Sequence, residues 1–224
     1  MSAAANPKQI VTVDVVLLTL HQGRLAVGLV RRESPPYPGR LALIGGYVHA
    51  DEDENADAAA ARVLREKANL DGFFLEQLAT FSGRDRDPRG WSASIAYLAL
   101  TPYAQLAGPL SADERFKLVP VEETTDLPFD HDQILAAALE RLRGKGAYST
   151  LPARLIDEPF TLTELQKVYE VALGLERLDK SSFRRKLNEL DLIEVAHGRR
   201  TDTGGRQAQL YRLKPGALLF NRRI

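Results

Sequence analysis

The strongest constraint on the fold is the run IVTVDVVLLTL at residues 10–20, whose apolar and β-branched residues predict a buried strand. A turn at 21–24 and the run LAVGLVRR at 25–32 predict that the next strand pairs back as a hairpin. Further strands are predicted at 75–83, 92–102 and 116–123, and residues 41–48 are predicted to be a strand followed by a glycine turn. Helices are predicted at 55–69 and 130–145. These elements indicate an α+β body.

The residues beyond 150 follow a different pattern of two helices and a basic hairpin. FTLTELQKVYEVALG (160–174) predicts a helix with a capping box, in which Thr161 and Glu164 each bond to the other's backbone. DKSSFRRKLNELDLI (179–193) predicts a second helix, and residues 193–213 predict a β-hairpin around a glycine-containing loop. This order is typical of a winged helix-turn-helix. We therefore expect two domains, residues 1–147 and residues 155–224.

The two parts of the chain also differ in charge, although the whole chain is neutral. Residues 1–150 carry 16 Lys and Arg against 20 Asp and Glu, whereas residues 151–224 carry 14 against 10. A basic C-terminal domain beside an acidic body indicates that the C-terminal domain binds a polyanion.

The second helix of the C-terminal domain offers a basic face for double-stranded DNA. If Phe183 and Leu187 are buried, helical geometry turns Arg185 and its neighbours outward, where they can enter a major groove. Arginines of the hairpin can reach phosphates or a minor groove. The predicted DNA-binding residues are Lys180, Ser181, Ser182, Arg184, Arg185, Lys186, Arg199, Arg200 and Arg206. The alternative is a protein-interaction module with a solvated basic helix.

Composition excludes several other kinds of site. The chain has no cysteine, which rules out disulfides, thiol nucleophiles and zinc–thiolate sites. Its four histidines lack metal-ligand spacing, and His131 is predicted to cap or pack at the start of a helix. No segment has the length of a membrane span, and the N-terminus has no apolar signal core, so we expect a cytoplasmic protein that does not contact membranes.

Residues 45–70 resemble the sequence box of Nudix pyrophosphohydrolases, G-x5-E-x7-R-E-U-x-E-E-x-G-U, in which U is an apolar residue. The E-x7-R spacing and several box positions are kept, at Glu54, Arg62, Leu64, Glu66 and Leu70. Three box positions are changed, at Val63, Lys67 and Asn69.

The changed positions remove the metal chemistry of the box. Positions 63, 66 and 67 share one helix face, where three carboxylates would chelate Mg²⁺. This chain has Val63, Glu66 and Lys67 there, so we predict no metal site, no catalytic residues, and hydrolysis that is absent or very slow. As a hypothesis, the fixed ammonium of Lys67 still attracts a diphosphate. The alternative is a surface lysine that pairs with a nearby acid.

The loop RDRDPRGW (84–91) is the other dense group of charged residues. Its arginines can clamp phosphates, and Trp91 can stack on a base. Equally, the alternating charges can form internal salt bridges that shape the loop, with Trp91 in the core. The predicted effector-binding residues, taken from this loop, the box and the end of the second strand, are Arg31, Arg32, Gly45, Gly46, Arg62, Glu66, Lys67, Arg86 and Arg89.

The chain as a whole resembles the NrtR family of Nudix-related regulators of NAD metabolism. The resemblance rests on the altered box and on LALIGGYVH (41–49), LEQLATFSGRDRDPRGWSASIAYLAL (75–100), LPFDHDQIL (127–135) and FTLTELQKVYEVALGLERLDKSSFRRKL (160–187). It implies a Nudix-like α/β/α sandwich with a mixed sheet, followed by the winged helix. It also implies a homodimer that represses NAD-biosynthesis or salvage genes at a palindromic operator. ADP-ribose or a related NAD metabolite is the implied effector, and no cofactor is required.

Two other functions stay open at this point. The first is a Nudix hydrolase of ADP-ribose or another nucleoside diphosphate derivative, with an auxiliary nucleic-acid-binding domain and at least weak pyrophosphatase activity. The second is a protein-interaction scaffold built on an inactive enzyme, which predicts no DNA affinity even at low salt.

Overall fold

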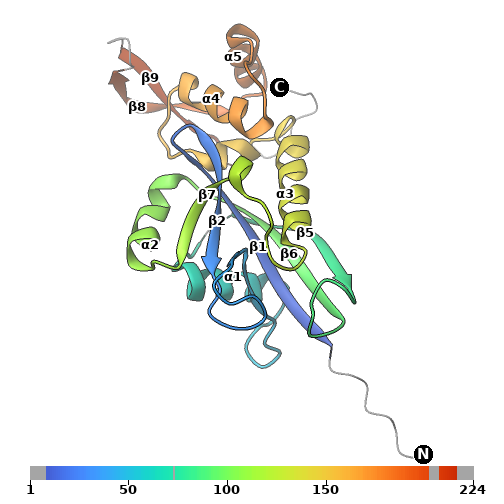
Figure 1. Cartoon of the computed structure of the whole chain (residues 1–224). Helices are drawn as coiled ribbons and strands as arrows, with labels where there is room; N and C mark the ends of the chain where they lie inside the picture. Colours follow the sequence, from blue (N-terminus) through green and yellow to red (C-terminus); the bar gives the residue numbers. More distant parts are fainter. Residues whose placement is uncertain (1–8, 73, 202–206, 216–224) are drawn as a thin grey trace, which may run out of the picture.

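The computed structural model describes residues 9–72, 74–201 and 207–215, and Figure 1 shows the path of the chain. The N-terminal body is built on a seven-stranded mixed sheet. Its strands are β1 (Ile10–His21), β2 (Arg24–Arg31), β3 (Leu41–Ala42), β4 (Ile44–Tyr47), β5 (Phe74–Gly83), β6 (Ser92–Leu100) and β7 (Phe116–Pro120). Each strand predicted from the sequence is present, with small shifts at its ends.

Strand β1 lies at the centre of the sheet. It pairs in parallel with β6, from Ile10 beside Ser92 to Leu18 beside Leu100. On its other edge it pairs antiparallel with β4 near its start and with β2 near its end. Because β1 has neighbours on both edges and is covered on both faces, its sequence is apolar almost throughout.

Helices cover both faces of the sheet (Figure 1). The side chains of β1 alternate between the faces, as the pleat of a strand requires. Val13 and Val15 pack with α1 (Ala56–Ala68), whereas Val16 and Leu18 pack with α3 (His131–Gly146). The predicted α+β class and the α/β/α sandwich are therefore confirmed.

One helix of the N-terminal body was not expected from the sequence. Helix α2 (Ala107–Ala112) contains Gly108 and Pro109, which are poor helix formers, although proline is tolerated in a first turn. Short 3-10 turns at Tyr103–Leu106 and Val121–Glu123 flank α2 and β7. Among the described residues, no helix is long and apolar enough to cross a membrane.

The C-terminal domain has the predicted winged-helix order of α4 (Leu162–Leu173), α5 (Lys180–Glu189), β8 (Ile193–Thr201) and β9 (Gln207–Leu213). The capping box of α4 is confirmed. The Thr161 hydroxyl accepts from the Glu164 N–H at 3.2 Å, and the Glu164 carboxylate accepts from the Thr161 N–H at 2.7 Å. The domain encloses its own core of Ala153, Phe160, Leu165, Tyr169, Phe183, Leu187, Leu192 and Ile193.

The two domains join through packed helices and not through a loose linker. Leu142 of α3 lies in one apolar cluster with Val168 and Ala172 of α4. The Tyr169 hydroxyl donates to the Ser149 carbonyl at 2.9 Å, and the 3-10 turn Leu151–Leu155 between the helices is mostly buried. Figure 1 shows the winged helix stacked on the end of the body where β1 turns into β2. A shift of α3 would therefore displace α4 directly.

Candidate functional site

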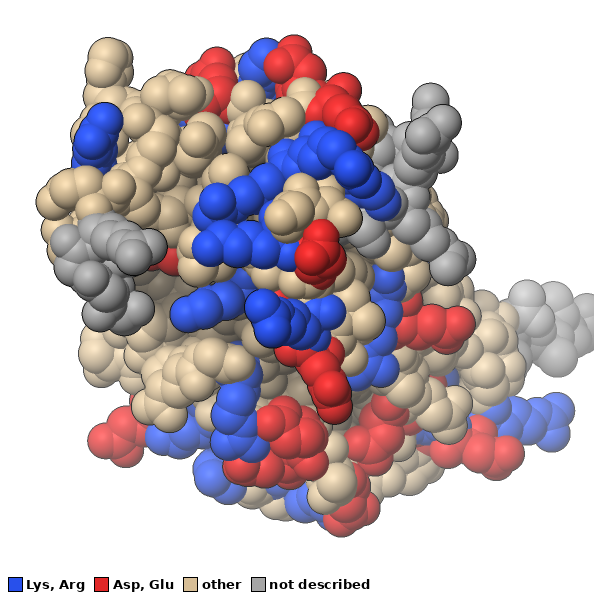
Figure 2. Space-filling view, turned by 90° about the horizontal axis from the view of Figure 1, so that it is seen from above, with Lys and Arg blue, Asp and Glu red and all other residues tan. Residues whose placement is uncertain are grey.

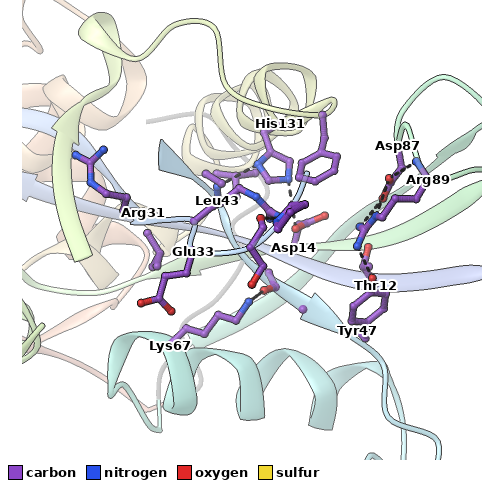
Figure 3. Close-up of a pocket in the computed structure, with 18 of the residues that line it drawn as sticks. Thr12, Asp14, Arg31, Glu33, Leu43, Tyr47, Lys67, Asp87, Arg89 and His131 are labelled. Atoms are coloured by element: carbon purple, nitrogen blue, oxygen red, sulfur yellow. Dashed lines mark hydrogen bonds and ion pairs between the residues drawn. The ribbon is translucent and has the colours of Figure 1, made fainter. Parts of the chain in front are cut away.

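A pocket of about 500 Å³ lies beside β1 and β4, against the N-terminus of α3. Figure 3 shows Lys67 reaching from α1 toward β4, while His131 points from α3 onto Asp14 of β1. Seven of the nine predicted effector-binding residues line this pocket: Arg31, Arg32, Gly45, Gly46, Lys67, Arg86 and Arg89. The fold thus brings together residues that lie far apart in the sequence.

Two of the pocket arginines are neutralised by carboxylates. Arg86 is buried and donates to both oxygens of Asp130, at 2.9 and 3.0 Å. Arg89 donates to both oxygens of Asp87, at 2.9 and 2.6 Å. Burial alone would raise the pKa of Asp87, but the hydrogen bonds from Arg89 outweigh it, and that pKa lies below its ordinary value. Arg89 and Asp87 form the internal salt bridge expected of the loop 84–91, whereas Arg86 pairs with Asp130 outside the loop. Both arginines line the pocket, and their contact with phosphate stays a prediction.

Two other cations of the pocket, Arg32 and Lys67, have no carboxylate partner in the described part of the chain, and the same holds for exposed Arg31, which donates to the Gly39 carbonyl at 2.6 Å. Arg32 donates to the Pro36 carbonyl at 2.8 Å, and its guanidinium lies 4.9 Å from the centre of the Phe129 ring. Lys67 donates to the Gly45 carbonyl. Burial lowers the pKa of both Arg32 and Lys67 and is the largest cause in each case. Repulsion from Arg89 lowers the pKa of Arg32 further, and repulsion from Arg32 lowers that of Lys67 further. Of the alternative for Lys67, a surface lysine paired with a nearby acid, the exposure is confirmed, but its partner is the Gly45 carbonyl and not a carboxylate.

The floor of the pocket holds a buried carboxylate, Asp14. The Ser94 hydroxyl donates to it at 2.6 Å, and Arg86 lies 3.5 Å away. His131 accepts from the Leu43 N–H through Nδ1, so its hydrogen is on Nε2, which lies 3.4 Å from Asp14. Burial alone would raise the pKa of Asp14, but His131, Ser94 and Arg86 together hold it below its ordinary value. His131 is packed at the start of α3, as predicted, and it also lines the pocket.

The glycine pair of the box lies in strand β4 and not in a turn, so the predicted turn is wrong. Gly45 stands opposite Asp14 in the β1–β4 ladder, and Gly46 stands opposite Val13. A Cβ on Gly45 would come within 1.9 Å of Asp14 Oδ1, and one on Gly46 within 2.9 Å of Val63 Cγ2. These glycines are required by the close approach of β1 and α1 and not by unusual backbone angles.

Gly45→Ala is expected to displace Asp14 from Ser94 and His131. Overpacking of this kind costs about 1–3 kcal/mol, which should appear as a lower free energy of unfolding in guanidinium chloride. Gly108→Ala is a matched control, since a Cβ there meets no atom within 4 Å. Equal stability of Gly45→Ala and the parent would show that the pocket floor adjusts without cost.

Arg62 and Glu66 of the box lie outside the pocket lining. Buried Arg62 donates to both oxygens of Asp53 at 2.8 Å, to the Tyr47 carbonyl at 2.9 Å, and to Glu66 at 3.2 Å. The hydrogen bonds from Arg62 lower the pKa of Asp53 to about 2. Arg62 therefore fixes the loop before α1 to the helix, and Glu66 is engaged by it. The predicted effector role of these two residues rests on the sequence resemblance alone.

Several pocket residues were not identified from the sequence. They are Thr12, Asp14, Glu33, Tyr47, Arg115 and Phe129, with His131 assigned only to packing. Asp14 carries a usable signal, since it is a charged residue within an apolar strand. The other residues carry no such signal in the sequence, because they come from strands and loops that meet only in the folded chain. Trp91 is 45% exposed and does not line the pocket, so its expected place in the core is wrong.

Helix α5 presents the predicted basic face. Phe183 and Leu187 are buried, as expected, and Arg185 is turned outward. Figure 2, which looks onto the winged-helix end of the molecule, shows lysines and arginines gathered in a band across this face. Arg184 leans toward α4, where its Nη2 lies 3.5 Å from the Thr163 hydroxyl. Of the remaining predicted residues of α5, Lys180 and Ser181 are exposed, and Ser182 and Lys186 are partly exposed.

The predicted DNA-binding arginines of the hairpin differ in their exposure and in their hydrogen bonds. Arg199 is exposed on β8. Arg200 donates to Glu164 at 2.8 Å and to the Pro159 carbonyl at 3.0 Å, so it ties the hairpin to the start of α4. Arg206 lies outside the described residues. The DNA contacts of these arginines remain predictions.

Family models match both domains. A NUDIX domain model matches residues 8–142, and a model of the NrtR DNA-binding winged helix domain matches residues 152–213.

Known proteins of this architecture are similar over nearly the whole chain. An "ADPR responsive transcriptional repressor NtrR" of Acinetobacter baylyi is 38% identical, over 92% of this chain and 82% of its own length. The solved Shewanella oneidensis NrtR with a 27mer DNA is 38% identical, with a TM-score of 0.89, over 96% of this chain and 99% of that one. The NUDIX domain of S. oneidensis NrtR complexed with ADP ribose is 36% identical, with a TM-score of 0.55, over 62% of this chain and 91% of that one. The chain therefore belongs to the NrtR family, as a Nudix domain followed by a winged-helix domain.

Proposed function

We propose that this chain is a transcriptional repressor that binds operator DNA through its winged helix and leaves it when ADP-ribose enters the Nudix pocket. The observation that carries the proposal is the match of both domains, in the same order, to a relative named as an ADPR responsive repressor. The related S. oneidensis structures hold a 27mer DNA and ADP ribose. The exposed basic face of α5 and the cationic pocket are the corresponding chemistry in this chain.

In this proposal, residues 1–147 form the domain that senses the effector, and residues 155–224 form the domain that binds DNA. The regulated genes in this proposal are those of NAD biosynthesis or salvage. We further propose a homodimer that reads a palindromic operator, since two recognition helices on a two-fold axis fit half-sites about 34 Å apart. An effector that favours another spacing of these helices weakens DNA binding by linkage, typically by about 1–3 kcal/mol.

DNA binding and release by ADP-ribose together test the proposal. Labelled duplexes from the promoters beside the chain's own gene are titrated with the protein, and fluorescence anisotropy is followed with and without ADP-ribose. We expect specific binding that weakens about 5- to 150-fold with saturating ADP-ribose. Absence of DNA affinity at low salt would instead support the scaffold alternative.

The Nudix domain is proposed to sense ADP-ribose without hydrolysing it. On the box face of α1, Val63 is buried against Gly46, Glu66 bonds to Arg62, and Lys67 carries a positive charge. In the described residues there is no group of three or more His, Asp or Glu that could hold a metal ion. Without such a group, no metal would activate the attacking water or spread the diphosphate charge.

We therefore expect no AMP above the uncatalysed background when the protein is incubated with ADP-ribose and Mg²⁺ or Mn²⁺. AMP is measured by ion-pair chromatography, with a Nudix ADP-ribose pyrophosphatase as the positive control. Turnover at an ordinary enzymatic rate, on the order of 1 s⁻¹ or faster, would favour the hydrolase alternative.

A further inference from the structure

We infer that this pocket binds a diphosphate through the fixed cations Arg32 and Lys67, with Lys67 in the place that a Nudix enzyme gives to its metal ion. Binding of ADP-ribose then needs no divalent cation. The inference rests on the proposed function, since it names the part of the effector that the pocket recognises and the charge that holds it.

The pocket holds cations whose charge is not balanced by an ion-pair partner among the described residues. Arg86 and Arg89 have their counter-charge in Asp130 and Asp87. Within the described chain, Arg32 and Lys67, like exposed Arg31, donate only to backbone carbonyls. Arg32 is half-buried, whereas Lys67 is exposed at the edge of the pocket that it lines. Two cations held without partners in a partly dehydrated pocket attract an anion more strongly than they would in water. The lowered pKa values of both groups agree with this, because a bound anion would reverse the shift.

The oxygen ligands that a metal ion would need in this pocket are already engaged. Each carboxylate that lines the pocket is engaged by donor groups, although Asp14 shares Arg86 with Asp130, so its charge offsets part of the positive charge of Arg32 and Lys67. Asp14 faces Arg86 and His131, Asp87 binds Arg89, and Glu33 binds Arg115 at 2.7 Å. The Gly45 carbonyl, which faces the same space, accepts from Lys67. A divalent cation would have to displace these bonds and stand beside an ammonium, so the residues present do not fit the magnesium of the Nudix family.

Arg32 and Lys67 suit a diphosphate in geometry and in charge. A guanidinium binds phosphate oxygens in a fixed fork, while an ammonium acts as a compact charge on a flexible stem. Arg32 is held by two backbone carbonyls and the Phe129 ring, which orients its fork in advance. Lys67 approaches from α1 on the β4 side of the pocket (Figure 3). Arg31, Arg32 and Lys67 bring three positive charges and Asp14 one negative charge, a net of two that matches the two negative charges of a diphosphate diester.

Calorimetry with and without metal separates this inference from the function on which it rests. ADP-ribose is titrated into the full-length protein in EDTA and again in Mg²⁺. We expect the same affinity in both buffers. Binding that requires Mg²⁺ would overturn the inference and leave ADP-ribose sensing intact. Binding in neither buffer would overturn the proposed function, and this inference with it.

Lys67→Met tests the role of the ammonium, since it keeps the length of the side chain and removes its charge. Charge-assisted hydrogen bonds are worth about 1.5–3 kcal/mol, so ADP-ribose should bind at least about tenfold more weakly. Arg65→Met is the matched control, because Arg65 is exposed on the same helix and does not line the pocket. It should change the affinity by less than about twofold, since solvent and salt screen exposed charges.

Inorganic pyrophosphate and adenosine show which part of the ligand Lys67 holds. We expect pyrophosphate to compete with ADP-ribose in EDTA, and Lys67→Met to weaken pyrophosphate as much as ADP-ribose while leaving adenosine unaffected. Thermal unfolding of both variants confirms that they are folded. Unchanged ADP-ribose affinity in folded Lys67→Met, or equal losses in Lys67→Met and Arg65→Met, would overturn the inference.

Discussion

Replacing Arg185 and Lys186 with alanine is expected to weaken operator binding about 30-fold or more, because each base or phosphate interaction of this kind is worth about 1–3 kcal/mol. Both residues lie on α5, where Arg185 is exposed on the side away from the buried Phe183 and Leu187, and Lys186 is partly exposed beside that buried face. Their removal leaves the core of the winged helix untouched. Affinity is measured by fluorescence anisotropy over a range of salt concentrations. The slope of log affinity against log salt should fall by about 1 for each DNA phosphate that the variant no longer neutralises.

The control for this double variant removes the same charge from the other domain. Arg65 and Arg84 are exposed on the Nudix domain, far from α5 in the sequence and in the fold. Alanine at both positions should leave operator affinity within about twofold of the parent, since distant exposed charges are screened by salt. Equal losses of affinity in the two double variants would show that net charge, and not a face of α5, determines DNA binding.

Gly146→Ala is expected to separate effector binding from DNA release. A Cβ on this last residue of α3 would lie 2.9 Å from Pro152 Cγ and 3.0 Å from Leu173 Cδ2, so α3 and α4 would have to move apart. The N-terminus of α3 forms a wall of the pocket, and its C-terminal half packs on α4. ADP-ribose should therefore bind with its usual affinity, while the coupling to DNA, ordinarily about 5- to 150-fold, falls toward onefold.

Gly144→Ala is the matched control for this coupling variant. It lies on the same helix, and a Cβ there meets no atom within 4 Å. Both substitutions gain helix propensity of about 1 kcal/mol, so their difference reports the packing against Pro152 and Leu173. The coupling is the ratio of operator affinities without and with ADP-ribose. A full response in Gly146→Ala would show that the signal does not travel through the α3–α4 interface.

The fold could be predicted from local patterns in the sequence. The β-branched run at 10–20, the capping box at Thr161, and the apolar spacing of Phe183 and Leu187 each specify an element within a few residues. The Gly45–Gly46 pair misled because glycine is equally suited to a turn and to a strand that another backbone approaches closely. Only the pairing with β1 separates these two roles.

The candidate site could be predicted in part. The sequence pattern predicted that Lys67 and several arginines bind a phosphate, but it did not show which of these cations are already paired with carboxylates. Arg89 is neutralised locally by Asp87, two residues away in the same loop, as the alternating charges of the loop had suggested. Asp130 approaches Arg86 only after α3 docks beside the loop 84–91. Asp14 and Phe129 likewise come from separate elements and meet across the pocket.

We propose that this chain reports ADP-ribose by leaving DNA and does not consume the signal. The most direct test adds ADP-ribose to the preformed operator complex in EDTA, with anisotropy followed continuously and nucleotides analysed by chromatography at the end. We expect the DNA to be released while the ADP-ribose remains intact. DNA that stays bound at saturating ADP-ribose, or that leaves only as AMP accumulates after Mg²⁺ is added, would contradict it.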